Sequence, residues 1–378
     1  MFGGVFFCFA CHGVNTPHED EANDSTSIDT AHEYPTPLEL IPETDFNDQL
    51  CSKRYGIEQN GIWQYIPYCA NFDISSAGSY PQVERLIFSI HSFDRPSAMY
   101  YQRMEQAAEL HGHEEQTMII SPFFPSEEHL SIYHLDETHA YWGGGWPAGS
   151  VSSSSDEHPR PFVISSYAFL DQMVLDILQN IHLPNLQKII FIGHSAGGQL
   201  VNRYAAGSKV DIQSPPIQYM VANPSSYVYL SSKRWNQDAA YTFSEPDQAT
   251  IDTCSEYNEW RYGLDDLYSY MSSTGMQTLR ENYHKRSVVV LIGGEDNDPD
   301  DSSLATGCAA MLQGSQRLER SYVYARHLED EFGQNPHAFA LLEGVGHSSR
   351  QVFLSQCGQL FLFDVPSTIP CDLSAYPH

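Results

Sequence analysis

IIFIGHSAGG (residues 189–198) is the stretch of sequence that decides the fold. It begins with an apolar run typical of a buried strand, continues with the pattern Gly-x-Ser-x-Gly, and leads into a helical pattern through Leu200, Val201 and Tyr204. Glycines on both sides of Ser195 predict a sharp, strained turn, because side chains there would collide with the strand and the helix. Such a turn holds the serine at the edge of a sheet. A glycine-rich turn with no chemical purpose is the alternative.

Strand and helix patterns alternate on both sides of this stretch. Strands are expected at 86–91, 117–121, 188–192, 218–222, 287–292 and 339–342. Helices are expected at 98–110, at 162–181, after Ser195, and from about residue 349. Because parallel strands need long crossover connections, this alternation predicts an α/β fold, with a mostly parallel central sheet and helices on both faces. Sites in such sheets lie at the carboxyl ends of the strands.

The stretch 189–198 resembles the nucleophile elbow of the α/β-hydrolase superfamily, and the resemblance extends over roughly residues 86–349. It implies that Ser195 is a nucleophile and that the backbone N–H of Ala196, at the start of the helix, stabilises an oxyanion. It also implies that an acid and then a histidine follow along the chain.

LEGVGHS (342–348) resembles the histidine loop of the same family, because a glycine-rich loop after the last predicted strand presents His347. His347 is therefore the expected general base. The acid is expected after the preceding strand. Asp296 fits the family spacing best, Asp298 is the second choice and Glu295 the third.

The second oxyanion donor is expected in the loop after strand 86–91. The backbone N–H of Ser92 or Phe93 is our choice, although a serine stands where the family usually has glycine. A plain loop at the end of a strand is the alternative.

YWGGGW (141–146) places two indoles around a flexible turn. We expect Trp142 and Trp146 to form an aromatic wall for the substrate, with His194 beside the nucleophile; loop packing is the alternative for the indoles. Tyr227, Tyr229, Trp260 and Tyr262 lie in a section that either completes a pocket or covers the sheet edge.

No cofactor and no metal site are expected. Asp298, Asp300 and Asp301 suggest calcium, but their spacing does not match an EF-hand loop, and a solvated acidic loop is the preferred interpretation. His111 and His113 have no third ligand at a supporting spacing.

Composition excludes several partners. The chain has 378 residues, and its 19 Lys and Arg against 48 Asp and Glu give a formal charge of −29. This charge repels nucleic acid and anionic lipid. No run approaches the roughly 20 apolar residues of a membrane crossing, so we expect a soluble protein.

The chain divides into three expected parts. Residues 1–16 resemble a signal-like leader without its usual positive residues. Residues 17–47 form an acidic arm, expected to be mobile, with the only glycosylation sequon at Asn23. Residues 48–378 form one hydrolase domain with an excursion at about 223–286.

The cysteines point to an oxidising compartment. Two of the eight, Cys8 and Cys11, lie in the leader, and the remaining six allow fifteen pairings. Local spacing favours the pairs 51–69 and 357–371, which leaves 254–308. We therefore expect three disulfides and secretion; free thiols in a cytosolic protein are the alternative.

These expectations combine into acyl transfer to water, in which Ser195 attacks, His347 carries the proton and Asp296 orients the histidine. A small-molecule or polymer carboxylic ester is the expected substrate. An amide or peptide substrate, and a non-catalytic binding protein on the same fold, are the alternatives. The oligomeric state is left open.

Overall fold

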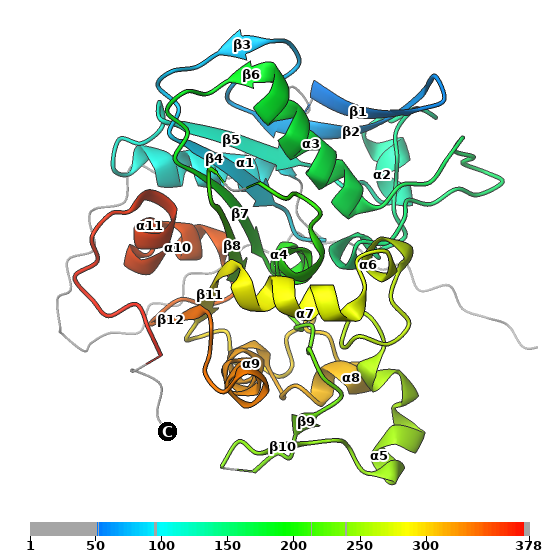
Figure 1. Ribbon diagram of the computed structural model, residues 1–378, viewed down its shortest axis with the longest axis vertical. Helices are drawn as coiled ribbons and strands as arrows, with labels where there is room; N and C mark the ends of the chain where they lie inside the picture. Colours follow the sequence, from blue (N-terminus) through cyan, green and yellow to red (C-terminus); the bar gives the residue numbers. More distant parts are fainter. Residues whose placement is uncertain (1–50, 52, 94–96, 213, 239, 374–378) are drawn as a thin grey trace, which may run out of the picture. The chain divides into compact units, whose positions relative to one another are not determined.

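An eight-stranded sheet organises the fold (Figure 1). The structure is a computed structural model, and it describes residue 51 and the ranges 53–93, 97–212, 214–238 and 240–373. The leader predicted at 1–16 and the arm predicted at 17–47 lie outside these residues. The strands follow the order β1-β2-β5-β4-β7-β8-β11-β12 across the sheet.

The strands of the sheet have these bounds: β1 Lys53–Gln59, β2 Ile62–Ala70, β4 Arg85–Ile90, β5 Thr117–Pro122, β7 Lys188–His194, β8 Ile217–Ala222, β11 Ser287–Gly293 and β12 Ala338–Leu342. Neighbouring strands from β5 to β12 are parallel, whereas β2 is antiparallel to both β1 and β5. The mostly parallel sheet and its six predicted strands are confirmed, with ends that differ from the prediction by one or two residues.

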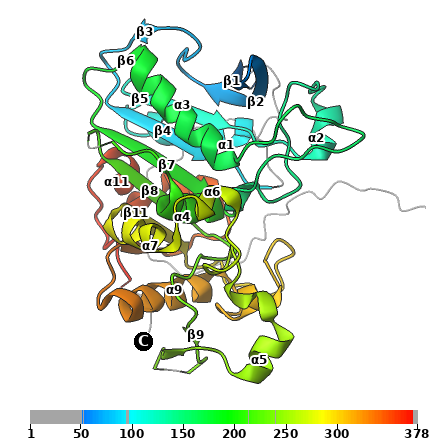
Figure 2. The same cartoon turned by 45° about the vertical axis from the view of Figure 1, so that its right-hand side comes forward.

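Helices pack on both faces of the sheet (Figure 2). One face is covered by α3 (Ser166–Asn180), α4 (Ala196–Gly207), α7 (Met276–Lys285) and α9 (Arg317–Phe332). The other is covered by α1 (Ser97–Glu109), α10 (Ser349–Leu354) and α11 (Gln356–Phe363).

The central strand β7 shows why the strands are apolar throughout. Ile189 and Phe191 pack into the core on the α4 side, whereas Ile190 and Ile192 pack into the core on the α1 side. Because successive side chains of a strand point to opposite faces, a strand covered on both faces needs apolar residues at every position. The predicted α/β fold with helices on both faces is therefore confirmed.

The hairpin formed by β1 and β2 was not predicted. Its turn, Asn60-Gly61, has φ of 55° and 83°, the left-handed conformation that suits a two-residue hairpin turn. The Asn-Gly pair was the available signal for this hairpin, but Pro67 within β2 interrupts the strand pattern.

Helix α9 was also not predicted. It buries four polar or charged side chains, Arg317, Arg320, Ser321 and His327, so its buried face has no clear apolar stripe in the sequence. Its N-cap is Gln316, whose side chain accepts from the Glu319 N–H, and glutamine is not among the residues usually read as a helix start.

The section 223–286 leaves the sheet and returns to it. It contains β9 (Arg234–Trp235), β10 (Phe243–Ser244), α5 (Gln248–Thr253), η2 (Ser255–Asn258), α6 (Ser269–Ser272) and α7. Tyr227 and Tyr229 are fully buried and stack against Tyr324 or His327 of α9. These two tyrosines therefore contribute to the core that covers the sheet.

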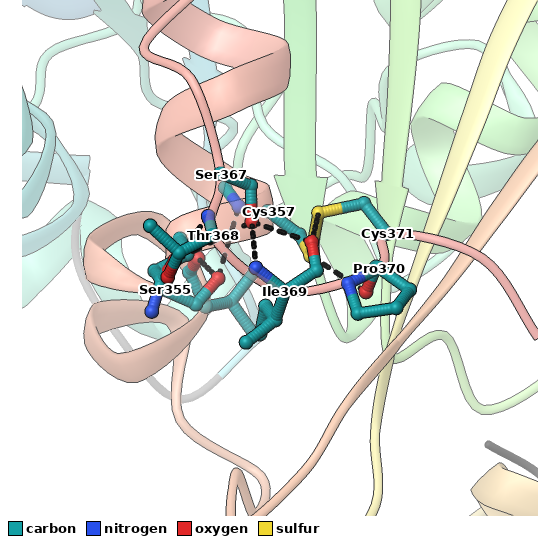
Figure 3. The surroundings of a disulfide bond; sticks show 10 residues. Ser355, Cys357, Ser367, Thr368, Ile369, Pro370 and Cys371 are labelled. Atoms are coloured by element: carbon teal, nitrogen blue, oxygen red, sulfur yellow. Dashed lines mark hydrogen bonds between the residues drawn. A yellow bond between two sulfur atoms is a disulfide. The ribbon is translucent and has the colours of Figure 1, made fainter. Parts of the chain in front are cut away.

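Three disulfides join Cys51 to Cys69, Cys254 to Cys308 and Cys357 to Cys371, which confirms the predicted pairing. Figure 3 shows the third, which fastens the segment after α11 to that helix. The backbone of the same segment accepts a hydrogen bond from the N–H of Leu341, so the segment protects part of the edge strand β12.

Within the residues that the structure describes, no helix has both the length and the apolar character needed to cross a membrane.

Candidate active site

The predicted turn connects β7 to α4, and Ser195 stands between them with φ 57° and ψ −118°. A side chain on Gly193 would come within 2.2 Å of the Gly197 backbone, and one on Gly197 within 2.3 Å of the Ile90 carbonyl oxygen. The glycines are therefore required by close backbone approach, as predicted. They let α4 begin directly against the end of β4, and they leave Ser195 at the strained position of the turn.

The histidine loop between β12 and α10 is tied to the end of β11. Asn223, which follows β8, accepts from the Gly293 N–H at 2.8 Å and donates to the Gly346 carbonyl oxygen at 3.2 Å. The Glu295 N–H adds a hydrogen bond to the Val345 carbonyl oxygen at 2.9 Å. Asn223 was not predicted as a site residue, because an asparagine beside a proline is an ordinary turn signal.

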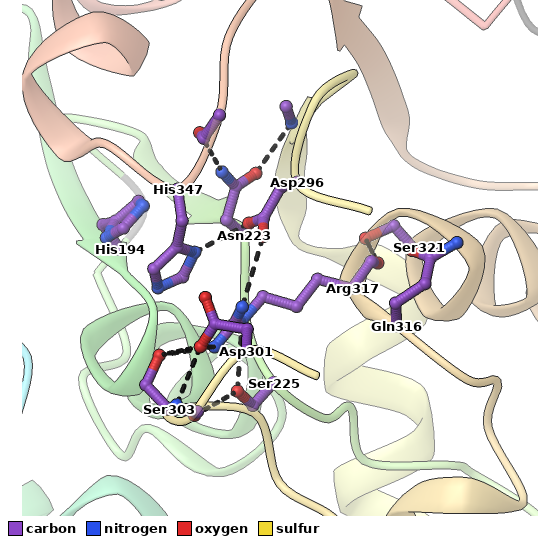
Figure 4. A network of polar contacts seen from close by, with 12 residues as sticks. His194, Asn223, Ser225, Asp296, Asp301, Ser303, Gln316, Arg317, Ser321 and His347 are labelled. Atoms are coloured by element: carbon purple, nitrogen blue, oxygen red, sulfur yellow. Dashed lines mark hydrogen bonds and ion pairs between the residues drawn. The ribbon is translucent and has the colours of Figure 1, made fainter. Parts of the chain in front are cut away.

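His347 and Asp296 come together at this edge (Figure 4), with 2.7 Å between His347 Nδ1 and Asp296 Oδ2. Asp296 is 5% exposed and His347 is 22% exposed. Because an ionised carboxylate only accepts hydrogen bonds, Nδ1 carries the hydrogen and Nε2 is left as an acceptor. Of the three candidate acids, Asp296 is the one that contacts the histidine. Asp298 and Glu295 have exposed side chains.

Ser195 lies one residue from His194, whose ring centroid is 4.4 Å from that of His347. The serine and the histidine loop are therefore neighbours at the carboxyl edge of the sheet. Across the described ranges, however, no hydrogen bond joins the Ser195 hydroxyl to His347. The His347–Asp296 hydrogen bond is formed, whereas a hydrogen bond between His347 and the serine is not.

His194, predicted on the substrate side, is buried. Its Nδ1 lies 3.5 Å from the Tyr100 hydroxyl, and its Nε2 has no hydrogen-bond partner. Burial, and secondarily the neighbouring His347, holds the pKa of His194 well below its ordinary value. The His194 ring is therefore neutral and packs against His347, and it leaves little surface for contact with a substrate.

The predicted oxyanion loop is held by His91 at the end of β4. His91 Nε2 accepts from the Phe124 N–H at 3.0 Å, so Nδ1 carries the hydrogen and donates to the Ser92 carbonyl oxygen at 2.7 Å. In a trans peptide unit the carbonyl and the next N–H point in opposite directions, so the Phe93 N–H points away from His91. Of the two predicted donors, Phe93 therefore has its backbone orientation fixed by a side chain.

The two indoles after β5 differ in their surroundings. Trp142 is fully buried, donates to the Ser150 carbonyl oxygen and packs edge-on against Phe124, so the loop-packing alternative fits it. Trp146 begins η1 (Trp146–Ala148), packs on His91 with 4.6 Å between ring centroids and meets Phe93 edge-on. Trp146 therefore packs against the predicted oxyanion loop, but it is only 3% exposed, so this indole too is part of the core.

One cluster in the described part of the chain has metal-ligand residues close together, and it consists of Cys254, Glu256 and Cys308. The two sulfurs form a disulfide, so they are not thiolate ligands. Asp301, part of the acidic loop, is engaged instead in an ion pair with Arg317. His113 stacks on Phe363.

Buried histidines predict a strong dependence of stability on pH. Burial lowers the pKa of His91 and of His337 to about 4 and places those of His194 and His327 well below their ordinary value. Between about pH 4 and pH 6.5 the unfolded chain therefore binds protons that the native state does not. The free energy of unfolding rises with pH across this window, and acidification removes about 3 kcal/mol for each histidine whose pKa is near 4.

Urea unfolding followed by tryptophan fluorescence at pH 7 and pH 5 measures this effect. His337→Gln should reduce the difference between the two pH values, whereas His111→Gln, at an exposed position, should leave it unchanged. Equal unfolding free energies of the wild type at both pH values would contradict the assignment of neutral buried histidines.

The strand order, the serine turn after β7 and the histidine loop after β12 together define the α/β-hydrolase fold. No protein-family model matches the sequence, and no curated protein matches it.

The solved structures that are similar to the chain include the following two. Poly(aspartic acid) hydrolase-1 from Sphingomonas sp. KT-1 has 19% identity and a TM-score of 0.53, covering 82% of this chain and 98% of its own. LpqC, a poly(3-hydroxybutyrate) depolymerase from Bordetella parapertussis, has 18% identity and a TM-score of 0.54, covering 84% of this chain and 92% of its own. At these identities the likeness shows the fold.

Proposed function

We propose that the chain is a serine hydrolase that cleaves carboxylic esters through an acyl-enzyme on Ser195. The observation that carries this proposal is the His347–Asp296 hydrogen bond of 2.7 Å, placed beside a serine held at φ 57° between a strand and a helix. A hydroxyl needs a base to become nucleophilic, and the base needs a carboxylate that orients it and stabilises its charged form.

In the first half-reaction Ser195 Oγ bonds to the ester carbonyl carbon while its proton passes to His347 Nε2. The oxyanion that forms is stabilised by the N–H groups of Ala196 and of Phe93 or Ser92. Ala196 begins α4, so its N–H has no acceptor inside the helix. The C–O bond to the alcohol then breaks, and His347 returns the proton to the leaving oxygen. Water repeats the sequence on the acyl-enzyme and releases the acid.

Charge favours a neutral ester over a polyanionic substrate. A chain with a formal charge of −29 repels an anionic polymer such as poly(aspartic acid), the substrate named for one of the similar proteins. The other is named for poly(3-hydroxybutyrate), a neutral polymer joined by ester bonds. The half-exposed ring of Phe93, which meets the buried Trp146 edge-on, supplies an apolar border near the proposed oxyanion donors. Small and polymeric esters both fit this description.

Secretion belongs to the same proposal. Three disulfides stabilise a chain in an oxidising compartment, whereas the cytosol keeps thiols reduced. An extracellular hydrolase would also meet polymeric substrates directly.

A substrate panel tests the proposal. Purified protein is assayed on p-nitrophenyl esters of increasing acyl length, on aromatic esters and on matched p-nitroanilides, with Ser195→Ala in parallel. We expect saturable ester cleavage that the alanine variant lacks. Cleavage of the anilides alone would favour the amidase alternative, and no cleavage by folded protein would favour a binding protein on this fold.

A further inference from the structure

Arg317 contacts the carboxylate that binds His347. Its side chain is 1% exposed, and Nη1 lies 3.2 Å from Asp296 Oδ1, the oxygen that His347 leaves free. Nη2 reaches Asp301 Oδ1 at 3.3 Å and Ser303 Oγ at 2.8 Å. Nε donates to Ser225 Oγ at 3.3 Å. The guanidinium therefore joins the loop after β11, which carries Asp296 and Asp301, to the segment after β8, which carries Ser225 (Figure 4).

We propose that Arg317 is a positioning residue that sets the orientation and the effective charge of Asp296, and through it the basicity of His347. This proposal rests on the proposed function. With one carboxylate oxygen on the imidazole and the other on a guanidinium, the carboxyl group is held at both ends. Rotation that would break the contact to His347 then also breaks a buried ion pair, which costs far more than a surface contact.

The charged groups around Asp296 and His347 determine whether loss of Arg317 raises or lowers the basicity of His347. They come from Arg317 on α9, from Asp301 in the acid loop and from Arg103 on α1, which acts on the neighbouring His194. Burial alone would raise the pKa of Asp301, but hydrogen bonds from Ser303 and Arg317 lower it to about 2, so Asp301 is ionised. Arg317 is thus a cation shared by two carboxylates.

Loss of the Arg317 guanidinium should change the pH at which activity is lost on acidification. Without Arg317, Asp296 exerts its full negative charge on His347, which favours the protonated imidazole. This change moves the loss of activity on acidification to higher pH. A residue that merely packs α9 against the sheet would not move it.

Arg320 provides a matched control. It is fully buried one turn further along α9 and donates to the carbonyl oxygens of Gly314 and Ser225. Neither Asp296 nor His347 is among its hydrogen-bond partners in the described structure. Arg320→Gln therefore removes a buried guanidinium from the same helix without removing the contact under test.

The experiment compares Arg317→Gln, Arg317→Lys and Arg320→Gln on the best ester of the panel. For Arg317→Gln we expect kcat about tenfold or more below wild type with KM within about threefold, and the acid limb of the kcat/KM profile about one pH unit higher. Arg317→Lys keeps the positive charge, so the acid limb of its kcat/KM profile should lie at the same pH as that of the wild type. Equal profiles for the 317 and 320 variants would overturn the proposal.

Two further measurements keep the outcome decisive. The His347 ring signal, titrated by NMR, should shift its midpoint upward in Arg317→Gln even if no ester in the panel is cleaved, which separates this proposal from the proposed function. If Arg317→Gln does not fold, Asp296→Asn/Arg317→Gln removes both buried charges. Its kcat/KM should equal that of Asp296→Asn, because the arginine acts only through the carboxylate. A further tenfold loss in the double variant would overturn the proposal.

Discussion

Ser195→Ala should lower kcat for ester hydrolysis by about a millionfold, close to the loss seen when a serine nucleophile is removed from a complete triad. The alanine variant retains the strained turn but has no oxygen to bond to the acyl carbon. KM should change little, because the groups that hold the substrate remain. Initial rates on the preferred p-nitrophenyl ester, measured at high enzyme concentration, give the residual activity.

Ser208→Ala is the matched control, because Ser208 is a buried serine at the opposite end of α4. It binds Asp171 rather than any residue of the site, so kcat should stay within about twofold of wild type. Activity of Ser195→Ala within tenfold of wild type would mean that another group is the nucleophile.

Asp296→Asn should lower kcat by about 10⁴-fold, because the amide can present its NH₂ group to His347 Nδ1 and so favour the wrong tautomer. The variant also removes the negative charge that stabilises the imidazolium. The same assay detects the loss, and a urea unfolding curve confirms that the protein is folded.

Asp298→Asn separates the two acids that the sequence left as alternatives. Asp298 is exposed and accepts from the Asp300 N–H, so its variant should retain activity within about twofold. A larger loss of activity for Asp298→Asn than for Asp296→Asn would mean that Asp298, and not Asp296, is the acid that orients His347.

The sequence predicted the parts of the fold that depend on local patterns. Buried strands such as β7 are short apolar runs. The glycines around Ser195 indicate that backbone segments approach each other too closely for a side chain. The histidine loop was predicted for the same reason, since a glycine-rich segment after an apolar strand is visible without coordinates. Two of the three disulfides were predicted from local spacing, and the third pair was the one that remained.

What the sequence did not show depends on contacts between distant segments. Arg317 stands 21 positions from Asp296 in a helix that was not predicted, and a buried arginine looks the same in sequence as a solvated one. Asn223 joins two loops that are 70 and 123 positions away from it. Trp142 illustrates the converse case, because an aromatic residue in a glycine-rich loop suits either a pocket or the core, and only the packing around it decides.

The most direct test of the account is covalent labelling of the native protein with an active-site fluorophosphonate, followed by peptide mass mapping. A serine activated by His347 and Asp296 should be phosphonylated at Ser195 in one-to-one stoichiometry, with no label on Ser195→Ala and markedly slower labelling of Asp296→Asn. Folded wild-type protein that takes up no label, or takes it up on a different residue, would contradict the account.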